Sequence, residues 1–403
     1  MIASSQYGRA VRYSRYTEAG MPLNNGYRNG KKDRKLVVVQ QSGGNDYLNS
    51  IVPYTNGLYY DFRSLTHHDP EDVLKINDTL GFGPTMGPIK ELWDEGKVAI
   101  IHGIGYPRPD RSHFRSMDIW HTAEPVEISQ EGWLGRAVRD MDPKSENVLT
   151  AVSFGVGLPR ALGCNGVPVA SVGDLETYGL FPDIQDEWLR EYALEAFGKM
   201  YGAAAGKEAV MGFLGQTGRD ALKGADILRT APEKYSSTIE YGTNPIARSL
   251  RDAAQVMFAD FGTRIFYTTH GGYDTHAGLK IAHPQLWSDL SPAVMDFLDD
   301  LEEHDEADET VMLIFSEFGR RVRDNGNGAD HGSGGVAFIV GNKVKGGMYG
   351  EYPSLEEKDH LDGDLHFNND FRGTYSSIIE DWLGLDPVPI VKGKFESFDL
   401  FKN

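Results

Sequence analysis

Carboxylate and imidazole side chains recur along this sequence in short polar segments that are rich in glycine. The candidates for metal ligands are Asp46 in GGND, Asp274 and His276 in GGYDTH, Glu317 in SEFGRR, and His331 in GADHGSGG. Carboxylates and neutral imidazoles together form the usual ligand set of zinc and similar divalent ions. Two such ions a few ångströms apart can hold both oxygens of an in-line displacement at phosphorus. These residues therefore predict a metal site of the kind that hydrolyses esters.

A serine–histidine pair, Ser112 and His113, lies in the segment DRSHF. A serine at the start of a helix lies in the positive field of free backbone N–H groups, and this field, together with a metal, would favour its alkoxide as a nucleophile. We expect both residues to be catalytic, with His113 as an acid–base group or as a further metal ligand. The alternatives are that Ser112 only caps the helix and that His113 is a buried structural histidine.

Side chains that could bind a substrate lie beside these residues. Arg111 and Arg115 flank the pair, and a guanidinium group could contact an anionic substrate, although both could equally be surface charges. Asn45 precedes Asp46, and we expect it to contact the substrate as well. Because Cys164 is the only cysteine, a metal must be held by histidine, carboxylate or hydroxyl groups. We expect zinc, with manganese, magnesium or calcium as alternatives.

Short apolar runs accompany these candidates in the manner of buried parallel strands. The runs that precede a candidate are LVVVQ at 36–40, KVAIIHG at 97–103, RIFYTT at 264–269 and VMLIF at 311–315. Ligands of open α/β sheets bind beyond the carboxyl ends of the strands, which is where these runs place the candidates. His331 instead comes before the run VAFIV at 336–340, on a glycine-rich loop that could reach the same edge.

Helical patterns, with apolar residues at three-to-four spacing, alternate with these runs. They cover residues 86–96, 186–202, 212–230, 244–262, 283–303 and 370–385. The alternation predicts an α/β fold with a mostly parallel central sheet flanked by helices. We expect one domain over residues 35–403, with a helical insertion at about 180–260. Residues 1–34 are poor in aliphatic side chains and are typical of a tail or arm.

The charge and hydropathy of the chain disfavour several kinds of partner. A net charge of −19 and a pI near 5.0 argue against a basic surface for nucleic acid or anionic lipid. No run approaches the roughly 18 apolar residues of a membrane span. The first thirty-odd residues hold no apolar segment typical of a secretory signal, so the chain as written would be cytoplasmic. The sequence is compatible with a homo-oligomer and does not indicate one.

Several motifs in a fixed order resemble the domain of unknown function 1501 family. They are RKLVVVQQSGGNDYLNSIVPY, HGIGYPRPDRSHFRSMDIWHTA, GWLGR, GGYDTH, FSEFGRRVRDNGNGADHGSGG and KGGMYGEYPSL. The resemblance runs from about Leu36 to the closing DFRGTY and WLG segments. This family belongs to the alkaline-phosphatase-like superfamily of phosphatases, sulfatases and phosphomutases, so the resemblance implies an alkaline-phosphatase-like fold.

The resemblance also implies roles for individual residues. Asp46 looks like the early aspartate that binds one metal, and Asp274 and His276 look like ligands of the other metal. Ser112 lies about where the superfamily has its nucleophile. Glu317 resembles the later carboxylate of the superfamily pattern, and His331 resembles its last histidine.

The chain departs from the superfamily pattern in several places. Glu317 and Phe318 stand where phosphatases have an Asp–His pair, so one histidine ligand is missing, which His113 could replace. The phosphatase spacing between aspartate and histidine is wider than in DTH. The sulfatase signature, Cys or Ser followed by x-P-x-R, is absent, which disfavours formylglycine chemistry. The family's members often carry a twin-arginine export signal, and this sequence shows none.

We therefore expect a metal-dependent hydrolase that acts on a phosphate or related ester of an anionic small molecule or polymer. One alternative is a catalytically degenerate binding or scaffold protein on the same fold, which the missing histidine favours. A second alternative is a metal-independent serine hydrolase. No G-x-S-x-G elbow surrounds Ser112, so we rank that alternative last.

Overall fold

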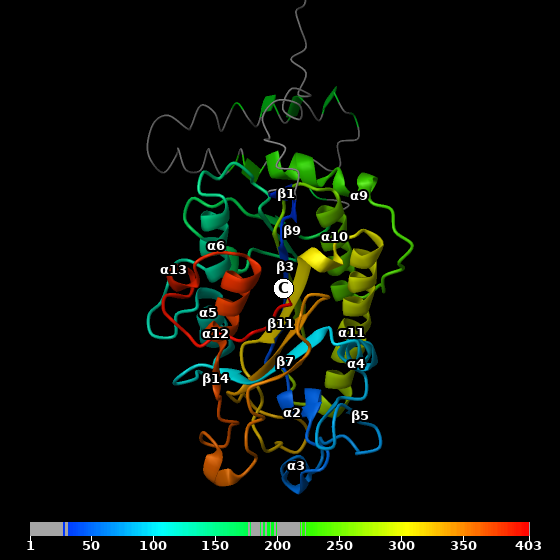
Figure 1. The fold of residues 1–403 in the computed structure, drawn as a ribbon, viewed down its shortest axis with the longest axis vertical. Coiled ribbons are helices and arrows are strands. Elements are labelled where there is room, and N and C mark those ends of the chain that lie inside the picture. Colours follow the sequence, from blue (N-terminus) through cyan, green and yellow to red (C-terminus); the bar gives the residue numbers. More distant parts are fainter. Residues whose placement is uncertain are drawn as a thin grey trace, which may run out of the picture.

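A nine-stranded sheet runs through the middle of the protein in this computed structural model (Figure 1). The structure describes residues 27–28, 31–175 and 223–402, together with scattered residues between 178 and 221. The strand order across the sheet is β13–β7–β12–β11–β3–β10–β8–β9, and β14 pairs with β7. Among these strands β12 runs antiparallel to both of its neighbours, β11 and β7, and the other pairings are parallel.

The strands of this sheet form where the sequence has its short apolar runs. They are β3 (Lys35–Ser42), β7 (Val98–Gly105), β8 (Ala151–Phe154), β9 (Ala170–Val172), β10 (Ile265–Gly271), β11 (Thr310–Ser316), β12 (Gly335–Val340), β13 (Gly347–Tyr349) and β14 (Asn369–Asp370). Two smaller sheets consist of β4 (Ile51–Val52), β5 (Leu74–Lys75) and β6 (Gly81–Phe82), and of β1 (Tyr27–Arg28) and β2 (Lys31–Lys32).

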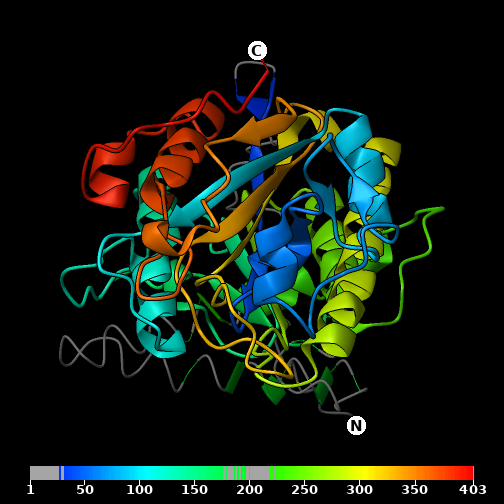
Figure 2. The ribbon, with the colours of Figure 1, turned by 90° about the horizontal axis from the view of Figure 1, so that it is seen from below.

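Helices cover both faces of the central sheet (Figures 1 and 2). One face carries α4 (Gly87–Asp94), α10 (Pro245–Phe258) and α11 (Leu279–Glu303), and the other carries α5 (His113–Thr122), α6 (Trp133–Met141), α12 (Phe371–Ser377) and α13 (Pro387–Val391). Alternate residues of β3 serve the two layers: Val37 and Val39 pack under the first group, and Leu36 and Val38 under the second. Burial on both faces explains why β3 is apolar without interruption.

Short helical elements complete the described chain. They are α2 (Tyr47–Ser50), α3 (Gly57–Phe62), α9 (Ala231–Lys234), the 3-10 turns Arg160–Leu162, Ala307–Glu309 and Glu357–Asp359, and a π-helical turn at Ile378–Trp382.

The predicted α/β class, with a mostly parallel sheet flanked by helices, is confirmed. Residues 1–26 of the predicted tail lie outside the described residues, as does most of 180–222 in the predicted helical insertion. The remainder of that insertion contains α10, which packs against α11 and β10 as part of the layer that covers the sheet. In the described part of the chain, no helix has the length and apolar character needed to cross a membrane.

The reversed direction of β12 decides where His331 lies. The carboxyl ends of β3, β7, β10 and β11 lie at one edge of the sheet because these strands run the same way. Since β12 runs the opposite way, its amino end lies at that same edge. A residue just before β12 therefore lies near residues that follow the other strands. This explains how the glycine-rich loop that carries His331 reaches the same edge.

Candidate metal centre

Loops at this edge bring four of the predicted residues together. His113 is the first residue of α5, Asp274 and His276 follow β10, and His331 precedes β12. The ligand atoms of His113, Asp274 and His331 all lie within 4.8 Å of one another. These residues come from three separate parts of the chain, and only the topology of the sheet makes them neighbours.

The three imidazole rings are arranged around a single carboxylate oxygen. Asp274 Oδ1 lies 3.3 Å from His113 Nε2, and it lies 3.2 Å from both His276 Nε2 and His331 Nε2. Zinc bonds of about 2.0–2.1 Å in a tetrahedral site would hold ligand atoms about 3.3 Å apart, so these separations fit. His276 Nε2 and His331 Nε2 are 2.8 Å apart and would have to separate by roughly 0.5 Å to bind one zinc ion.

The other nitrogen of each ring contacts an oxygen that can only accept a hydrogen bond. His113 Nδ1 lies 2.8 Å from Glu317 Oε1, His276 Nδ1 lies 2.9 Å from Asp330 Oδ1, and His331 Nδ1 lies 2.6 Å from the carbonyl oxygen of Arg111. Each Nδ1 must therefore carry the proton, which leaves a lone pair on Nε2 of the neutral ring. Metal-binding histidines have this arrangement, with the outer nitrogen held by a carboxylate or a carbonyl.

The charges at the site favour a cation. Burial alone would raise the pKa of Asp274, but the hydrogen bond and the positive charge of Arg320 outweigh it and hold this pKa well below its usual range. The hydrogen bond with His276 lowers the pKa of Asp330. Burial lowers the pKa of His331, whereas the hydrogen bond to Glu317 raises the pKa of His113. Both aspartates are therefore ionised at neutral pH, and several lone pairs face one point.

A buried guanidinium group ties the loops of the site together. Arg320 is 1% exposed. Its Nη2 donates to Asp274 Oδ1 at 2.8 Å and to the carbonyl oxygen of Tyr273 at 2.9 Å. Its other hydrogen bonds go to the carbonyl oxygens of Gly43, Gly44 and Ala329. The side chain thus fixes Asp274 against the loops that follow β3 and precede β12.

Glu317 lies behind His113 and does not face the centre. Its Oε1 accepts from His113 Nδ1 and, at 2.9 Å, from the backbone N–H of Gly43, and its Oε2 accepts from the Ser316 hydroxyl at 2.9 Å. The side chain is 1% exposed. Both carboxylate oxygens are therefore engaged by protein groups, so these contacts support a role for Glu317 in holding His113 and do not support the ligand role that the sequence indicated.

Asp46 also lies apart from the cluster, in a closed ion pair. Both of its oxygens accept from Arg63, at 2.6 and 3.0 Å, and both side chains are fully buried. Burial acts to raise the pKa of Asp46, but the attraction of Arg63 outweighs it, so the pKa lies below its usual range. The structure does not bring Asp46 to the imidazoles, and its metal-ligand role is not supported by these contacts.

Ser112 lies at the N-cap position of α5, next to His113, and is exposed. Its side chain makes no capping hydrogen bond, and its own backbone N–H donates to Asp110 Oδ1 at 2.7 Å. The capping alternative is therefore not what the structure shows. Among the described residues, no imidazole is hydrogen-bonded to the Ser112 hydroxyl, so the arrangement that a metal-independent serine hydrolase requires is not formed there.

The three predicted substrate-binding residues are engaged by the protein itself. Asn45 is buried, and its Oδ1 accepts from Ser50 and His283. Arg111 pairs with Asp364 at 2.9 Å and with Asp362 at 3.2 Å. Arg115 pairs with Asp118 at 2.7 Å and donates to three carbonyl oxygens, those of Glu124, Pro125 and Glu127. Binding of substrate by Arg111 and Arg115 is not supported by these contacts, and Asn45 is 2% exposed.

Two residues that matter here, Arg63 and Arg320, escaped prediction. Both are fully buried arginines, a rare environment for a charge unless it is paired. Arg320 lies in SEFGRR, three residues after the candidate ligand Glu317. For Arg63 the sequence holds no signal that distinguishes it from a surface arginine.

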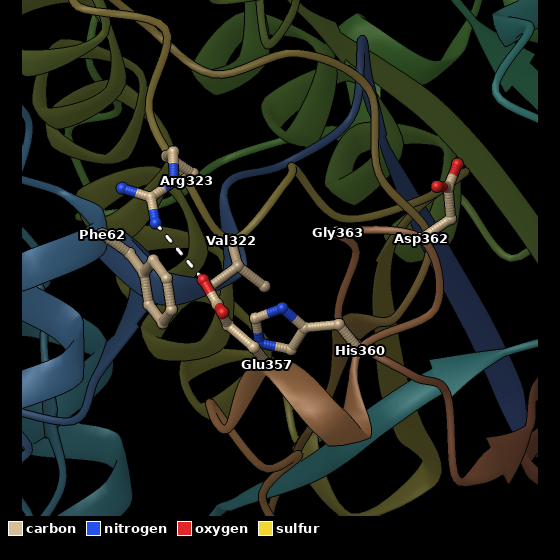
Figure 3. Close-up of a pocket in the computed structure, with 7 residues that line it drawn as sticks. All are labelled: Phe62, Val322, Arg323, Glu357, His360, Asp362 and Gly363. Carbon is tan, nitrogen blue, oxygen red and sulfur yellow. Dashed lines mark hydrogen bonds and ion pairs between the residues drawn. The ribbon is translucent and has the colours of Figure 1, made fainter.

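A cavity of about 320 Å³ is connected to the centre through the contacts of Arg111 (Figure 3). Phe62, Arg323, Glu357, His360 and Asp362 are among the residues that line it, and Arg323 reaches toward Glu357 at 3.5 Å. Asp362 accepts from the guanidinium group of Arg111, whose carbonyl oxygen holds His331. Arg111 thus contacts both Asp362 in the wall of the cavity and the imidazole ring of His331 in the centre.

Comparison with known sequences confirms the resemblance to a family. The model of the family described as "Protein of unknown function (DUF1501)" matches residues 202–375. This range includes Asp274, His276, Glu317 and His331. None of the curated proteins compared with the chain is similar to it in sequence.

Solved structures with a similar fold include members of the alkaline phosphatase superfamily. One is a protein of that superfamily from Vibrio parahaemolyticus, with 11% identity, a TM-score of 0.36, and coverage of 81% of this chain and 64% of that one. Another is the PsFucS1 sulfatase from Pseudoalteromonas sp., with 12% identity, a TM-score of 0.39 and coverage of 91% and 71%. A third is the C-terminal periplasmic domain of EcEptC from Escherichia coli in complex with Zn, with 8% identity, a TM-score of 0.36 and coverage of 77% and 74%.

Proposed function

We propose that this protein is a metal-dependent hydrolase of phosphate or related esters. The metal, for which zinc is the best match, would be held by His113, Asp274, His276 and His331. The observation that carries the proposal is the orientation of the rings. Three imidazoles donate from Nδ1 to protein oxygens and turn Nε2 toward Asp274 Oδ1. Three nitrogens and one carboxylate oxygen form a donor set that zinc binds well.

The substrate class follows from charge. The chain carries a net charge of −19, so an anionic ester would bind only where a local positive centre exists. A divalent ion in this donor set supplies that centre and polarises the ester. The cavity that Arg111 connects to the centre offers one guanidinium, two carboxylates and an imidazole, which could contact the organic part of the ester. This mixture favours a substrate whose organic part is polar.

Ser112 is the proposed nucleophile. It is exposed, adjoins His113 in the chain, and lies at the amino end of a ten-residue helix, where the backbone field favours an oxyanion. A Ser112→Ala variant should lose turnover and keep its metal content. Full activity in that variant would exclude a seryl intermediate and point to water as the nucleophile.

Metal analysis combined with turnover tests the proposal. We expect purified full-length chain to bind zinc and to hydrolyse an aryl phosphate or aryl sulfate ester, and chelation followed by zinc should abolish and restore the activity. His331→Ala should lose both metal and turnover, whereas His366→Ala, at an exposed histidine elsewhere, should keep both. A chain that binds no metal and is indifferent to chelator would contradict the proposal.

A binding or scaffold protein is the second candidate function. The closed pair of Asp46 with Arg63 favours it, because the resemblance implied a metal ligand at Asp46. Zinc bound at full stoichiometry, without turnover of any phosphate or sulfate ester tried, would favour this candidate over the hydrolase.

A further inference from the structure

We propose that the centre holds a single divalent ion and that the guanidinium group of Arg63 takes the place of a second cation beside Asp46. This inference rests on the proposed function and narrows it. Resemblance to the superfamily implied two metals, one at Asp46 and the other at Asp274 and His276. The contacts of Asp46 and of the three histidines instead divide these residues into two sites of different kinds.

The first observation is that the Asp46 site is closed. Arg63 Nη1 donates to Asp46 Oδ2 at 2.6 Å, and Arg63 Nη2 donates to Oδ1 at 3.0 Å. Both side chains have no exposed surface. A planar guanidinium group matches a carboxylate in this two-bond geometry, and both oxygens that a metal would use are occupied.

Two further N–H groups of Arg63 are also hydrogen-bonded. Its Nε donates to the carbonyl oxygen of Val322 at 2.7 Å, and its Nη2 also donates to the carbonyl oxygen of Arg321 at 2.7 Å. A metal at Asp46 would have to displace a buried cation that holds these four hydrogen bonds. Removal of one partner from a buried ion pair is strongly destabilising, so the pair excludes a competing cation.

The second observation is that the imidazoles form one set around one oxygen. His113, His276 and His331 each direct Nε2 at Asp274 Oδ1, and none of them is directed at Asp46. In the described part of the chain, the ligand atoms of His113, Asp274 and His331 lie within 4.8 Å of one another, and His276 Nε2 joins the same cluster at 3.2 Å from Asp274 Oδ1 and 2.8 Å from His331 Nε2. The described residues thus offer one metal-binding set.

The consequence concerns what the protein itself must supply. In a two-metal centre both the attacking and the leaving oxygen meet a metal ion. With one ion, the charge at the second position must be met by protein groups. Asp46 holds the Arg63 guanidinium in place, so this charge cannot move toward a substrate. The pair instead connects the loop after β3 to the backbone of residues 321–322.

Zinc stoichiometry tests this inference. Full-length chain would be stripped with a chelator, dialysed against zinc and analysed for metal per chain. We expect one zinc ion per chain, and the same value in the double variant Asp46→Leu/Arg63→Met. That variant removes both charges together, and exchange of a buried ion pair for apolar side chains is often neutral for stability. His331→Ala is the matched control and should bind no zinc at the same concentration.

The outcomes separate this inference from the proposed function. Two zinc ions per chain in the unmodified protein, or loss of one zinc ion in the double variant, would overturn the single-ion centre and leave the hydrolase standing. No zinc in the unmodified protein would overturn both.

X-ray absorption of the zinc-loaded protein gives a second measurement that needs no variant. We expect a first shell of nitrogen and oxygen atoms with imidazole scattering. A metal–metal distance of about 3.5–4 Å, as in two-metal sites, would overturn the inference.

Discussion

The exchange Glu317→Gln tests whether this residue binds the metal or holds a residue that does. In the structure its Oε1 accepts from His113 Nδ1 and Gly43, and its Oε2 contacts Ser316. A glutamine can keep these contacts: its oxygen accepts from His113 and Gly43, and its amide donates to the Ser316 hydroxyl, whose proton can turn to the carbonyl oxygen of Gln41 at 2.7 Å. The exchange therefore removes a negative charge and little else.

The expected effect follows from the place of Glu317 behind His113. A carboxylate at the outer nitrogen makes the ring a stronger ligand, and its loss typically weakens metal binding by about 10–100-fold. This factor corresponds to about 1.4–2.7 kcal/mol of binding free energy. The low exposure of Glu317, 1%, argues for the upper half of that range because solvent does not screen the pair.

Competition with a chelator of known zinc affinity measures this factor. Asp330→Asn is the matched comparison, since Asp330 contacts His276 in the same way at 2.9 Å but is 51% exposed, so we expect a loss of about tenfold at most. A Glu317→Gln loss well above a thousandfold, with zinc missing from the purified variant, would make Glu317 a direct ligand. An unchanged affinity would remove His113 from the ligand set.

Three further predictions test the supports of the site and of the fold. Gly328→Ala places a Cβ atom 2.2 Å from the carbonyl oxygen of Thr275 and 2.4 Å from the carbonyl carbon of His276. We therefore expect denaturant titration to show a free energy of unfolding lower by about 1–3 kcal/mol. Gly57→Ala, whose Cβ meets nothing within 4 Å, should leave the free energy of unfolding nearly unchanged. Arg320→Lys keeps the charge but leaves several carbonyl oxygens without donors, and thermal unfolding should show a loss of at least about 2 kcal/mol. Burial lowers the pKa of His102 to about 4. Between pH 6.5 and 4, His102 therefore binds a proton in the unfolded chain but not in the folded chain. Stability therefore falls as the pH falls, by roughly 3 kcal/mol at pH 4 for this ring, and His102→Gln should remove that part of the slope; equal slopes in the two proteins would show that burial of His102 is not the cause.

The strands and their ends were predictable because a strand that is buried on both faces has a continuous run of apolar residues in the sequence. The apolar runs before Asp274 and Glu317 became β10 and β11, and the polar residues after them lie at the predicted edge. The direction of a strand does not change the composition of its apolar run. VAFIV at 336–340 has the same composition as its parallel neighbours, yet β12 runs against them.

The roles of individual carboxylates could not be predicted, because they depend on partners far away in the chain. Asp46 and Glu317 both follow strands, as Asp274 does, and nothing local distinguishes the three. What separates them is whether a cation or a donor lies against them: Arg63 for Asp46, and His113 with Gly43 for Glu317. Sequence order was enough to place these residues at one edge of the sheet. Which partner each carboxylate oxygen contacts is determined by side-chain packing.

Arg320 explains why the loops at this edge can hold ligands in register. Its guanidinium group contacts carbonyl oxygens in the segments after β3, after β10 and before β12, and all of its hydrogen bonds form only if these segments stand in their observed places. A buried guanidinium with missing partners is costly, so the fold itself holds the loops in this arrangement. Asp274 is fixed by the same group, and the three imidazoles are fixed by Glu317, Asp330 and the Arg111 carbonyl oxygen. Because the protein orients every proposed ligand by contacts of its own, little of the binding free energy of a metal is needed to assemble the site.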